Sequence, residues 1–186
     1  MFLPIGVLEL ARFASKDSTR ETLHFIQIRQ NATHIVAAAT DGFVLAMYSS
    51  PLLGEREQEH RDFYLPAKRV LEILKFVPAK AKKEGADLDI EAGTLTFGFG
   101  RATYKITVAS VVEFPNVDRI REASYDAPAK AVDLDAQFLA KISTYLKAVN
   151  HSTIVTMEPH GELEPIKLSL KYDGTDVQFF CMPCRR

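Results

Sequence analysis

The sequence of 186 residues contains only two cysteines and no long hydrophobic run. Cys181 and Cys184 lie too close together for the disulfide framework of a small secreted domain, and a chain of this length buries roughly 70% of its extended-chain surface without disulfides. No apolar run approaches the ~20 residues that a membrane-spanning helix needs. The apolar start includes Glu9 and Arg12 and lacks a small-residue cleavage site, which excludes a signal peptide. We therefore expect a reduced, cytoplasmic protein.

An excess of charge of one sign is also missing. The formal net charge is -1, so contact with nucleic acid would require basic residues gathered locally. The sequence lacks a phosphate-binding loop, a nucleophile elbow and an outstanding pair of catalytic carboxylates. The five histidines, at positions 24, 34, 60, 151 and 160, show no metal-ligand spacing. We expect no enzymatic activity, no cofactor and no metal.

Cys181-Met-Pro-Cys184 has the spacing of a redox motif, but its position is unusual for one. A reactive pair of this spacing usually begins a helix, which lowers the thiol pKa, whereas this pair ends a predicted strand. No second cysteine pair offers zinc ligation. The tract 158–164, EPHGELE, is more typical of a solvated turn than of a ligand cluster. These features disfavour redox or metal chemistry.

One heptapeptide occurs twice. VLELARF at 7–13 and VLEILKF at 70–76 both follow a Leu-Pro pair, at 3–4 and 65–66. Both copies have the spacing of an amphipathic helix, and Pro78 ends the second. Their polar faces hold Glu9, Arg12 and Lys16 in the first copy and Lys68, Glu72 and Lys75 in the second. The repetition indicates a copied supersecondary unit.

Three extended segments follow each repeated helix. They are 22–30, 34–40 and 43–50 after the first, and 87–92, 94–100 and 101–110 after the second. The Asp41-Gly42 turn signal precedes the segment at 43–50. Each unit therefore has a short entry strand, a helix and three antiparallel strands.

A third unit follows a polar linker at about 116–131. Residues 131–149 begin with an alternating strand, Asp135 suits an N-cap, and an apolar helical stripe follows. Strands are expected at 152–159, 165–172 and 175–183. The fold class is α+β with three βαβββ units. We expect a complete domain at 1–120 from units 1–60 and 61–120, a linker at 121–130, and a half domain at 131–186.

Three motifs resemble, in order, those of the bacterial sliding clamp, the β subunit of DNA polymerase III. AATDGFVLA (38–46) is similar to its ATDGHRLA motif, EFPNVDRI (113–120) to the segment closing its middle domain, and FFCMPCRR (179–186) to its terminal VVMPMRL. The resemblance covers nearly the whole chain but only the clamp's middle domain and the second half of its last domain. It implies the DNA-clamp fold, in which helices line a central hole and sheets lie outside.

The resemblance implies a processivity factor on the nucleoid that encircles double-stranded DNA and tethers polymerase or repair proteins. The alternative is a clamp-fold module that competes for clamp partners without encircling DNA. Cations on the inner helices would contact phosphates without reading sequence. The candidate DNA-binding residues are Arg12, Lys16, Lys68, Arg69, Lys75, Lys80, Lys82, Lys83, Lys141 and Lys147. Alternatively, these residues are the ordinary charge of exposed helix faces.

The resemblance also implies a groove for short linear motifs. When the family's groove residues are carried over to this sequence by motif, the groove comprises Leu23, Thr40, Gly42, Phe43, Val44, Leu45, Pro66, Val70, Phe180, Cys181, Met182, Pro183, Cys184 and Arg185. An apolar groove with a methionine suits varied peptide anchors, although ordinary core remains the alternative for each Leu or Val. Two positions depart from the family's motifs. Phe43-Val44 stands where the family has His-Arg, and Arg186 stands where it has a final Leu. Both differences change the character of the groove.

The third unit has no second half in this chain. We expect Phe138, Leu139, Ile142 and Leu146 to lack a partner in their own chain. Leaving each of these side chains in water would forgo roughly 1.5–3 kcal/mol of burial free energy. Isologous pairing with the third unit of another copy would complete a domain. Clamp rings close with twelve units, so four chains of three units predict a homotetramer, with a homodimer as the alternative.

Overall fold

The computed structural model describes residues 1–52, 61–91, 93–107, 113–122, 132–149, 154–160 and 164–184. The first unit contains β1 (Phe2–Leu3), α1 (Ile5–Glu9), the 3-10 helices η1 (Leu10–Phe13) and η2 (Glu21–Leu23), β2 (Phe25–Gln30), β3 (His34–Thr40) and β4 (Val44–Pro51). The predicted helix at 7–13 is thus confirmed, but its second half is tightened into η1. Gly42 allows the predicted turn between β3 and β4, because its φ of 92° suits glycine.

The second unit repeats this order with one addition. It contains β5 (Arg61–Pro66), α2 (Ala67–Phe76), α3 (Ala79–Glu84), β6 (Ala86–Glu91), β7 (Thr94–Phe99) and β8 (Ala102–Thr107). The prediction of a helix at 70–76 is confirmed. α3 was not predicted: Pro78 ends α2, but its φ of -58° also suits the residue before a new helix.

The third unit contains α5 (Ala136–Val149), β9 (Thr156–Glu158), β10 (Ile166–Tyr172) and β11 (Thr175–Cys181), after α4 (Asp118–Arg121) in the linker. The predicted N-cap is confirmed, because the Asp135 carboxylate accepts a 2.8 Å hydrogen bond from the Gln137 amide. Within residues 132–135 no strand forms, contrary to the prediction of an entry strand there. No helix in the described ranges is long and apolar enough to cross a membrane.

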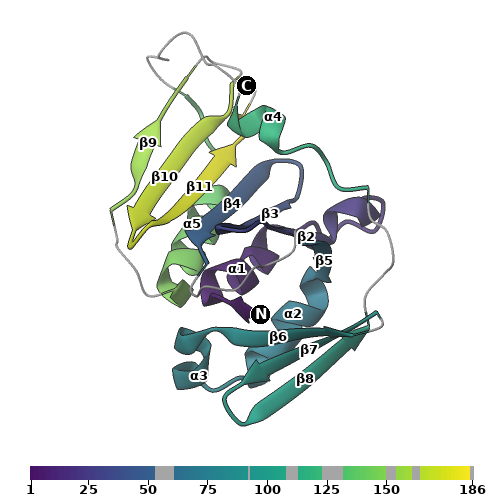
Figure 1. The fold of residues 1–186 in the computed structure, drawn as a ribbon. Helices are drawn as coiled ribbons and strands as arrows, with labels where there is room; N and C mark the ends of the chain where they lie inside the picture. The colour runs from purple at the N-terminus through teal and green to yellow at the C-terminus, as the bar shows by residue number, and fades with distance from the viewer. Residues whose placement is uncertain are drawn as a thin grey trace.

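The units exchange their entry strands. β1 pairs with β6 of the second unit, and β5 pairs with β2 of the first. One sheet has the order β1-β6-β7-β8 and the other β5-β2-β3-β4-β11-β10-β9. Figure 1 shows α1 and α2 between the two sheets, so the helices of both units share one core.

The last strand of the third unit joins the last strand of the first. β11 pairs antiparallel with β4, with Phe179 opposite Ala46 and Phe180 opposite Leu45. The third unit therefore continues the sheet of the first inside one chain. A strand was expected at 175–183, but a hydrophobic pattern does not specify which edge a strand joins.

α5 packs on this same junction. The rings of Phe13, Tyr145 and Phe179 form a triangle with centroid distances of 5.9, 5.4 and 5.6 Å. Ile142, Tyr145 and Val149 are buried, which corrects the expectation that the stripe of this helix has no partner in its own chain. Phe138 and Leu146 are partly buried against the core, and Leu139 remains 42% exposed.

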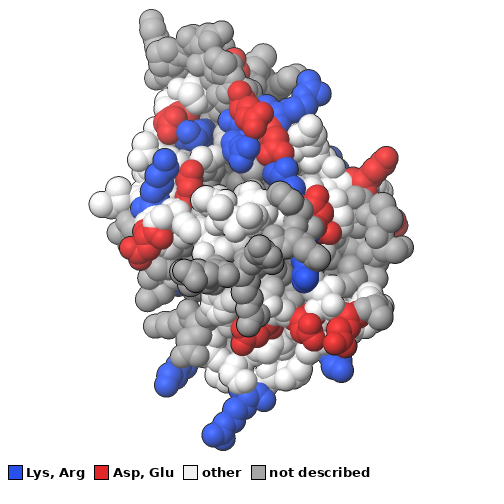
Figure 2. Space-filling model, in the orientation of Figure 1, with Lys and Arg blue, Asp and Glu red and all other residues white. Residues whose placement is uncertain are grey.

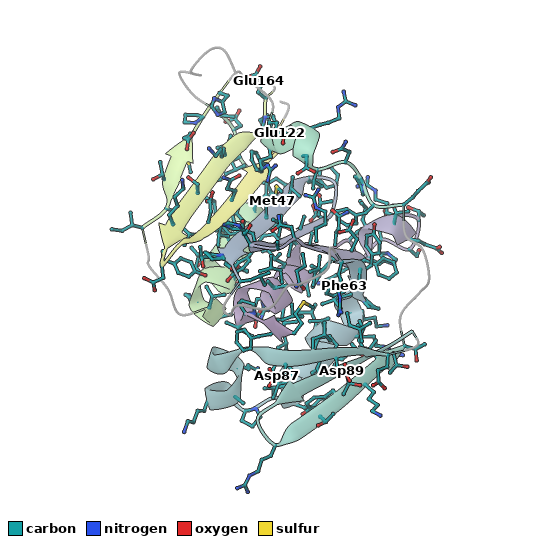
Figure 3. All side chains as sticks on the ribbon, viewed as in Figure 1. Met47, Phe63, Asp87, Asp89, Glu122 and Glu164 are labelled. Carbon is teal, nitrogen blue, oxygen red and sulfur yellow. The ribbon has the colours of Figure 1, made fainter. Side chains whose placement is uncertain are left out.

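A second apolar cluster lies on the opposite face of the seven-stranded sheet. Met47 on β4, labelled in Figure 3, packs there with Leu45, Phe180 and Val117. Val117 immediately precedes α4, which is tied to β2 because Nη1 and Nη2 of Arg29 donate hydrogen bonds to the Asp118 carboxylate, at 2.5 and 2.9 Å. The linker thus covers this face of the sheet.

Candidate nucleic-acid and peptide interfaces

A concave depression gathers cations from three elements. It has a volume of about 430 Å³ and lies where η1, α2 and α3 meet. Its basic lining residues are Arg12, Lys16, Lys68, Lys75 and Lys82, accompanied by Leu71, Leu74 and a single carboxylate, Glu72. The repeated heptapeptide explains the convergence, because Arg12 and Lys75 occupy the same position in its two copies.

The cations of this depression differ in how far their charge is compensated. Arg12 bonds through Nε to the Glu9 carboxylate at 2.5 Å, and Glu9 is only 2% exposed. Lys16, Lys68 and Lys75 are exposed. A hydrogen bond from Arg69 lowers the pKa of Glu72, so this carboxylate stays ionised near neutral pH. The depression therefore keeps a net positive charge.

The other candidate DNA-binding residues lie elsewhere. Arg69 lines a different depression beside β8 and bonds to Glu72 at 2.8 Å. Lys80 on α3 and Lys147 on α5 are exposed. Lys141 forms an ion pair with Asp41, next to the predicted peptide groove. The side chain of Lys83 lies outside the described residues.

Acidic and basic side chains are interspersed over the face shown in Figure 2. Asp87 and Asp89, which are labelled on β6 in Figure 3, are exposed on the four-stranded sheet. A mixed surface of this kind does not attract a polyanion as a cluster of cations does. Together with the formal net charge of -1, this mixed face indicates that the cationic depression is a local feature rather than part of a general positive charge.

The turn between β3 and β4 is held by Asp41. Its Oδ1 accepts hydrogen bonds from the amides of Phe43 and Val44 at 3.0 and 2.9 Å. Its other carboxylate oxygen accepts from Lys141 on α5. Its backbone carbonyl accepts from Arg20 at 2.9 Å. Burial raises the pKa of Asp41, but the bonds from Lys141, Val44 and Phe43 outweigh burial and lower it overall.

This turn meets the end of the chain. The Met182 amide donates a 2.8 Å hydrogen bond to the Phe43 carbonyl. The Cys184 amide donates a 2.8 Å hydrogen bond to the backbone carbonyl of Asp133. Phe43 is 52% exposed and Met182 41% exposed, so two large apolar side chains face solvent at one place. The Arg20 guanidinium lies 5.2 Å from the centre of the Phe43 ring.

Only some of the predicted groove residues lie at this surface. Gly42, Phe43, Met182 and Cys184 are exposed, and Pro66 and Pro183 are half-buried. Buried side chains are those of Leu23, Thr40, Val44, Leu45, Val70, Phe180 and Cys181. These seven belong to the core or its margin in this conformation. Arg185 lies outside the described residues.

Sequence reasoning missed Arg20. This residue lies in the segment between η1 and η2, where no periodicity or motif marks it. Its role appears only when the fold brings it to Asp41 and Phe43. A Cβ atom at Gly42 would lie 2.6 Å from its guanidinium, so the glycine also provides room for this contact.

The two cysteines are free thiols in different surroundings. Cys181 is buried and Cys184 is exposed. Burial, together with the nearby Asp41 carboxylate, raises the pKa of Cys181 to about 12. A thiol with such a pKa is unreactive near neutral pH. Among the described residues, no group of His, Cys, Asp and Glu is arranged to hold a metal.

Residues 6–116 match the family model of the central domain of the DNA polymerase III beta subunit. The solved beta subunit of Streptococcus pyogenes DNA polymerase is similar to this chain, with a TM-score of 0.75 and 13% identity over all of this chain and 66% of its own. The beta subunit of Thermotoga maritima has a TM-score of 0.70 and 13% identity over 100% of this chain and 65% of its own.

The beta sliding clamp of C. crescentus has a TM-score of 0.72 and 14% identity, and the similarity covers 99% of this chain and 64% of that chain. The chain thus spans about two thirds of the length of these clamp chains. At such low identity the likeness shows a shared fold, which confirms the predicted clamp fold. No curated protein sequence matches this chain.

Proposed function

The chain belongs to the DNA polymerase III beta subunit family, and from this premise we propose that it is a processivity factor whose ring encircles double-stranded DNA. The observation that carries the proposal is the depression lined by Arg12, Lys16, Lys68, Lys75 and Lys82. The protein would bind without catalysis or cofactor, in the cytoplasm on the nucleoid. Its partners would be polymerase or repair proteins tethered through short linear motifs.

The chemistry of the depression suits a protein that slides. Lys and Arg contacts to phosphates carry no sequence information and release counterions, so affinity falls steeply with salt. The depression contains cations on flexible side chains rather than an array of groups placed to read base edges. Such contacts retain DNA without fixing its register.

The test is retention on circular DNA. The double variant Lys68→Glu/Lys75→Glu should lose retention on a nicked plasmid and show a flatter dependence on salt, because two phosphate contacts become repulsive. A matched control is Arg119→Glu/Lys171→Glu, which makes the same charge change at two exposed sites on α4 and β10. Linearising the plasmid should release the wild-type protein from the ends.

Two results would oppose the proposal. Unchanged retention of Lys68→Glu/Lys75→Glu would place the DNA path elsewhere. Equal retention on linear and circular DNA would indicate ordinary surface binding rather than encirclement.

One observation favours the second candidate function, a module that competes for clamp partners. Phe43 and Met182 offer an exposed apolar surface that is separate from the residues lining the cationic depression. Peptide binding by this surface does not require a ring. A chain that binds clamp-motif peptides but never retains circular DNA would support this candidate over the first.

The proposed ring contains four copies, with a dimer as the alternative. In this proposal residues 1–120 form a complete domain, and 131–186 form a half domain that a second copy completes. Phe138, Leu139 and Leu146 remain partly or largely exposed for this contact, whereas Ile142 is used inside the chain. Among the described strands, β9 is an edge of the seven-stranded sheet, and in this proposal its free edge also takes part in the contact.

A further inference from the structure

The two copies of the repeated heptapeptide differ most in what covers them. In the first unit, α5 and β11 bury one face of α1 and η1, and Phe13 contacts both Tyr145 and Phe179. The residue at the same position of the second copy, Phe76, is 75% exposed. No other large apolar side chain of α2 is as exposed.

The contrast extends over a whole helix face. The first-unit residues Gly6, Glu9, Leu10 and Phe13 are all buried. Their equivalents at the same spacing in the second unit are Arg69, Glu72, Ile73 and Phe76, and all four line an open depression of about 690 Å³. The rest of its lining comes from Phe25, Pro66 and the β8 residues Tyr104, Lys105, Ile106 and Thr107. This face of the second unit has the composition of a contact surface but no cover within the described chain.

The last strands of the three units also differ, because two of them are paired with each other and one is not. The last strands of the first and third units, β4 and β11, pair with each other. β8, the last strand of the second unit, pairs only with β7 and is an edge of the four-stranded sheet as described. Three units supply an odd number of last strands, so among the described strands of each chain one is left without a partner of its own kind.

We propose that β8 and the exposed face of α2 form a homotypic interface with a second copy of this chain. β8 would pair antiparallel with β8 of the other copy about a two-fold axis normal to the sheet. The two α2 helices would then lie side by side, as α1 and η1 lie beside α5, and Phe76 would be covered as Phe13 is. Charge is compatible, because each copy contributes both Arg69 and Glu72 to this face.

Side chains select the register. Centring the axis on Tyr104 places Tyr104 opposite its symmetry mate, Ala102 opposite Ile106, and Thr103 opposite Lys105. Tyr104 and Ile106 are opposite Phe97 and Leu95 of β7 and so face the core, whereas Thr103 and Lys105 are exposed on the other face. Centring on Lys105 would set two like charges directly opposite each other, which is destabilising.

This inference concerns assembly and does not depend on DNA binding. It supplies one of the two interfaces that the proposed ring requires, and the other is the contact between third units. A chain that pairs through β8 but fails to retain circular DNA would keep the inference and reject the ring.

Disulfide trapping tests the interface and its register together. In a Cys184→Ser background, which removes the exposed thiol, Thr103→Cys and Lys105→Cys are prepared as separate proteins. Directly opposite residues in an antiparallel pair have Cβ atoms about 4.5–5.5 Å apart, and diagonal residues are about 7–8 Å apart. A mixture of the two proteins should therefore form a disulfide-linked dimer on mild oxidation faster than either protein alone.

Asp89→Cys is the matched control, because Asp89 is exposed on the same sheet but on the interior strand β6. It should not cross-link. A mixture that cross-links no faster than this control would overturn the interface. Faster cross-linking of Lys105→Cys alone would overturn the register centred on Tyr104. Pairing of third units alone would not bring positions 103 and 105 together, so the two interfaces are distinguished.

Three further variants separate association from folding. Phe76→Ser should weaken association about tenfold or more, as truncating a central aromatic side chain does, without lowering the stability of the single chain. Thr103→Lys should associate more weakly than Thr103→Glu, because position 103 faces Lys105 of the other copy. Sedimentation equilibrium measures both differences. Equal association of all three proteins and the wild type would overturn the proposal.

Discussion

Asp41 connects three parts of the chain through one carboxylate. It accepts hydrogen bonds from Phe43 and Val44 in its own turn and from Lys141 on α5, while its carbonyl accepts from Arg20. The side chain is only 15% exposed, so water cannot fully replace these partners. Phe43 and Met182 reach solvent on a surface whose position this carboxylate helps to fix.

We predict that Asp41→Asn destabilises the fold by about 1–2 kcal/mol at pH 7, because the amide cannot reproduce a bond from a charged ammonium group. The pKa of Asp41 is lowered by folding from its ordinary value of 3.8. A lowered pKa contributes stability that is complete above the ordinary value and lost as pH falls below it. The difference between wild type and variant should therefore shrink below about pH 4.

Urea unfolding between pH 7 and pH 3 measures this difference. Asp89→Asn serves as the control, since Asp89 is exposed on β6. A difference between wild type and Asp41→Asn that stays constant over the whole range would show that the charge of Asp41 is not what stabilises the turn.

The two thiols should react very differently. With the pKa of Cys181 raised to about 12, we predict that alkylation at pH 8 modifies Cys184 alone in the folded protein. Unfolding in urea should expose Cys181 to the reagent as well. Mass spectrometry of the alkylated peptides distinguishes the two sites, and rapid modification of Cys181 in the native protein would contradict its burial.

At the scale of elements, α4 acts as a cover for the outer apolar cluster. Val117, the residue before α4, is 2% exposed and packs with Leu45, Met47 and Phe180, whereas Ile120 inside the helix is 37% exposed. We predict that Val117→Ala lowers the free energy of unfolding by about 1–2 kcal/mol, from lost burial and an unfilled space. Ile120→Ala is the matched control and should cost clearly less. Equal effects in chemical denaturation would show that the cluster does not contribute as a unit.

The tail after β11 belongs to the proposed peptide surface. We predict that deleting residues 182–186 abolishes binding of clamp-motif peptides, because it removes Met182 from beside Phe43. The fold should survive, since the deleted residues follow the last strand. Fluorescence anisotropy with a labelled peptide measures binding, and circular dichroism checks the fold. Phe43→Ser should weaken binding as well, and full-strength binding by the truncated chain would place the site elsewhere.

Elements were more predictable from the sequence than their partners. The two heptapeptides predicted α1 with η1 and α2, and the strands expected at 34–40 and 165–172 match β3 and β10 to within one residue. The pairing of β4 with β11 was not predictable, because alternation fixes which face is buried but not which edge is joined. For the same reason the partners of Ile142 and Tyr145 could not be predicted from the helix stripe.

The candidate sites were likewise predictable only in part. Spacing on the repeated helices predicted that Lys68 and Lys75 lie on one polar face, and they do line one depression. Spacing could not show that Lys141 pairs with Asp41, a contact between residues 100 positions apart. Nor could motif matching distinguish exposed Phe43 from buried Val44, since exposure depends on which segments pack over the turn.

At the scale of the whole molecule, two surfaces are left uncovered by the part of the chain that the structure describes. One is β8 with Phe76, and the other is the edge at β9 with Leu139. If each surface binds its own kind about a two-fold axis, the two interfaces alternate along an assembly. Such an assembly closes into a ring only when the rotations bring its ends together, and four chains supply the twelve units that clamp rings contain.

We therefore predict a particle of about four times the 20.8 kDa chain mass in light scattering, with a dimer at low concentration. Phe76→Ser should stop assembly at the dimer held by third units, and Leu139→Lys at the dimer held by β8, because each variant damages one of the two interfaces. The double variant should be monomeric and folded. A wild-type monomer at tens of micromolar would reject both interfaces. A wild-type dimer that Leu139→Lys leaves intact and Phe76→Ser dissociates would reject the ring while keeping the contact through β8.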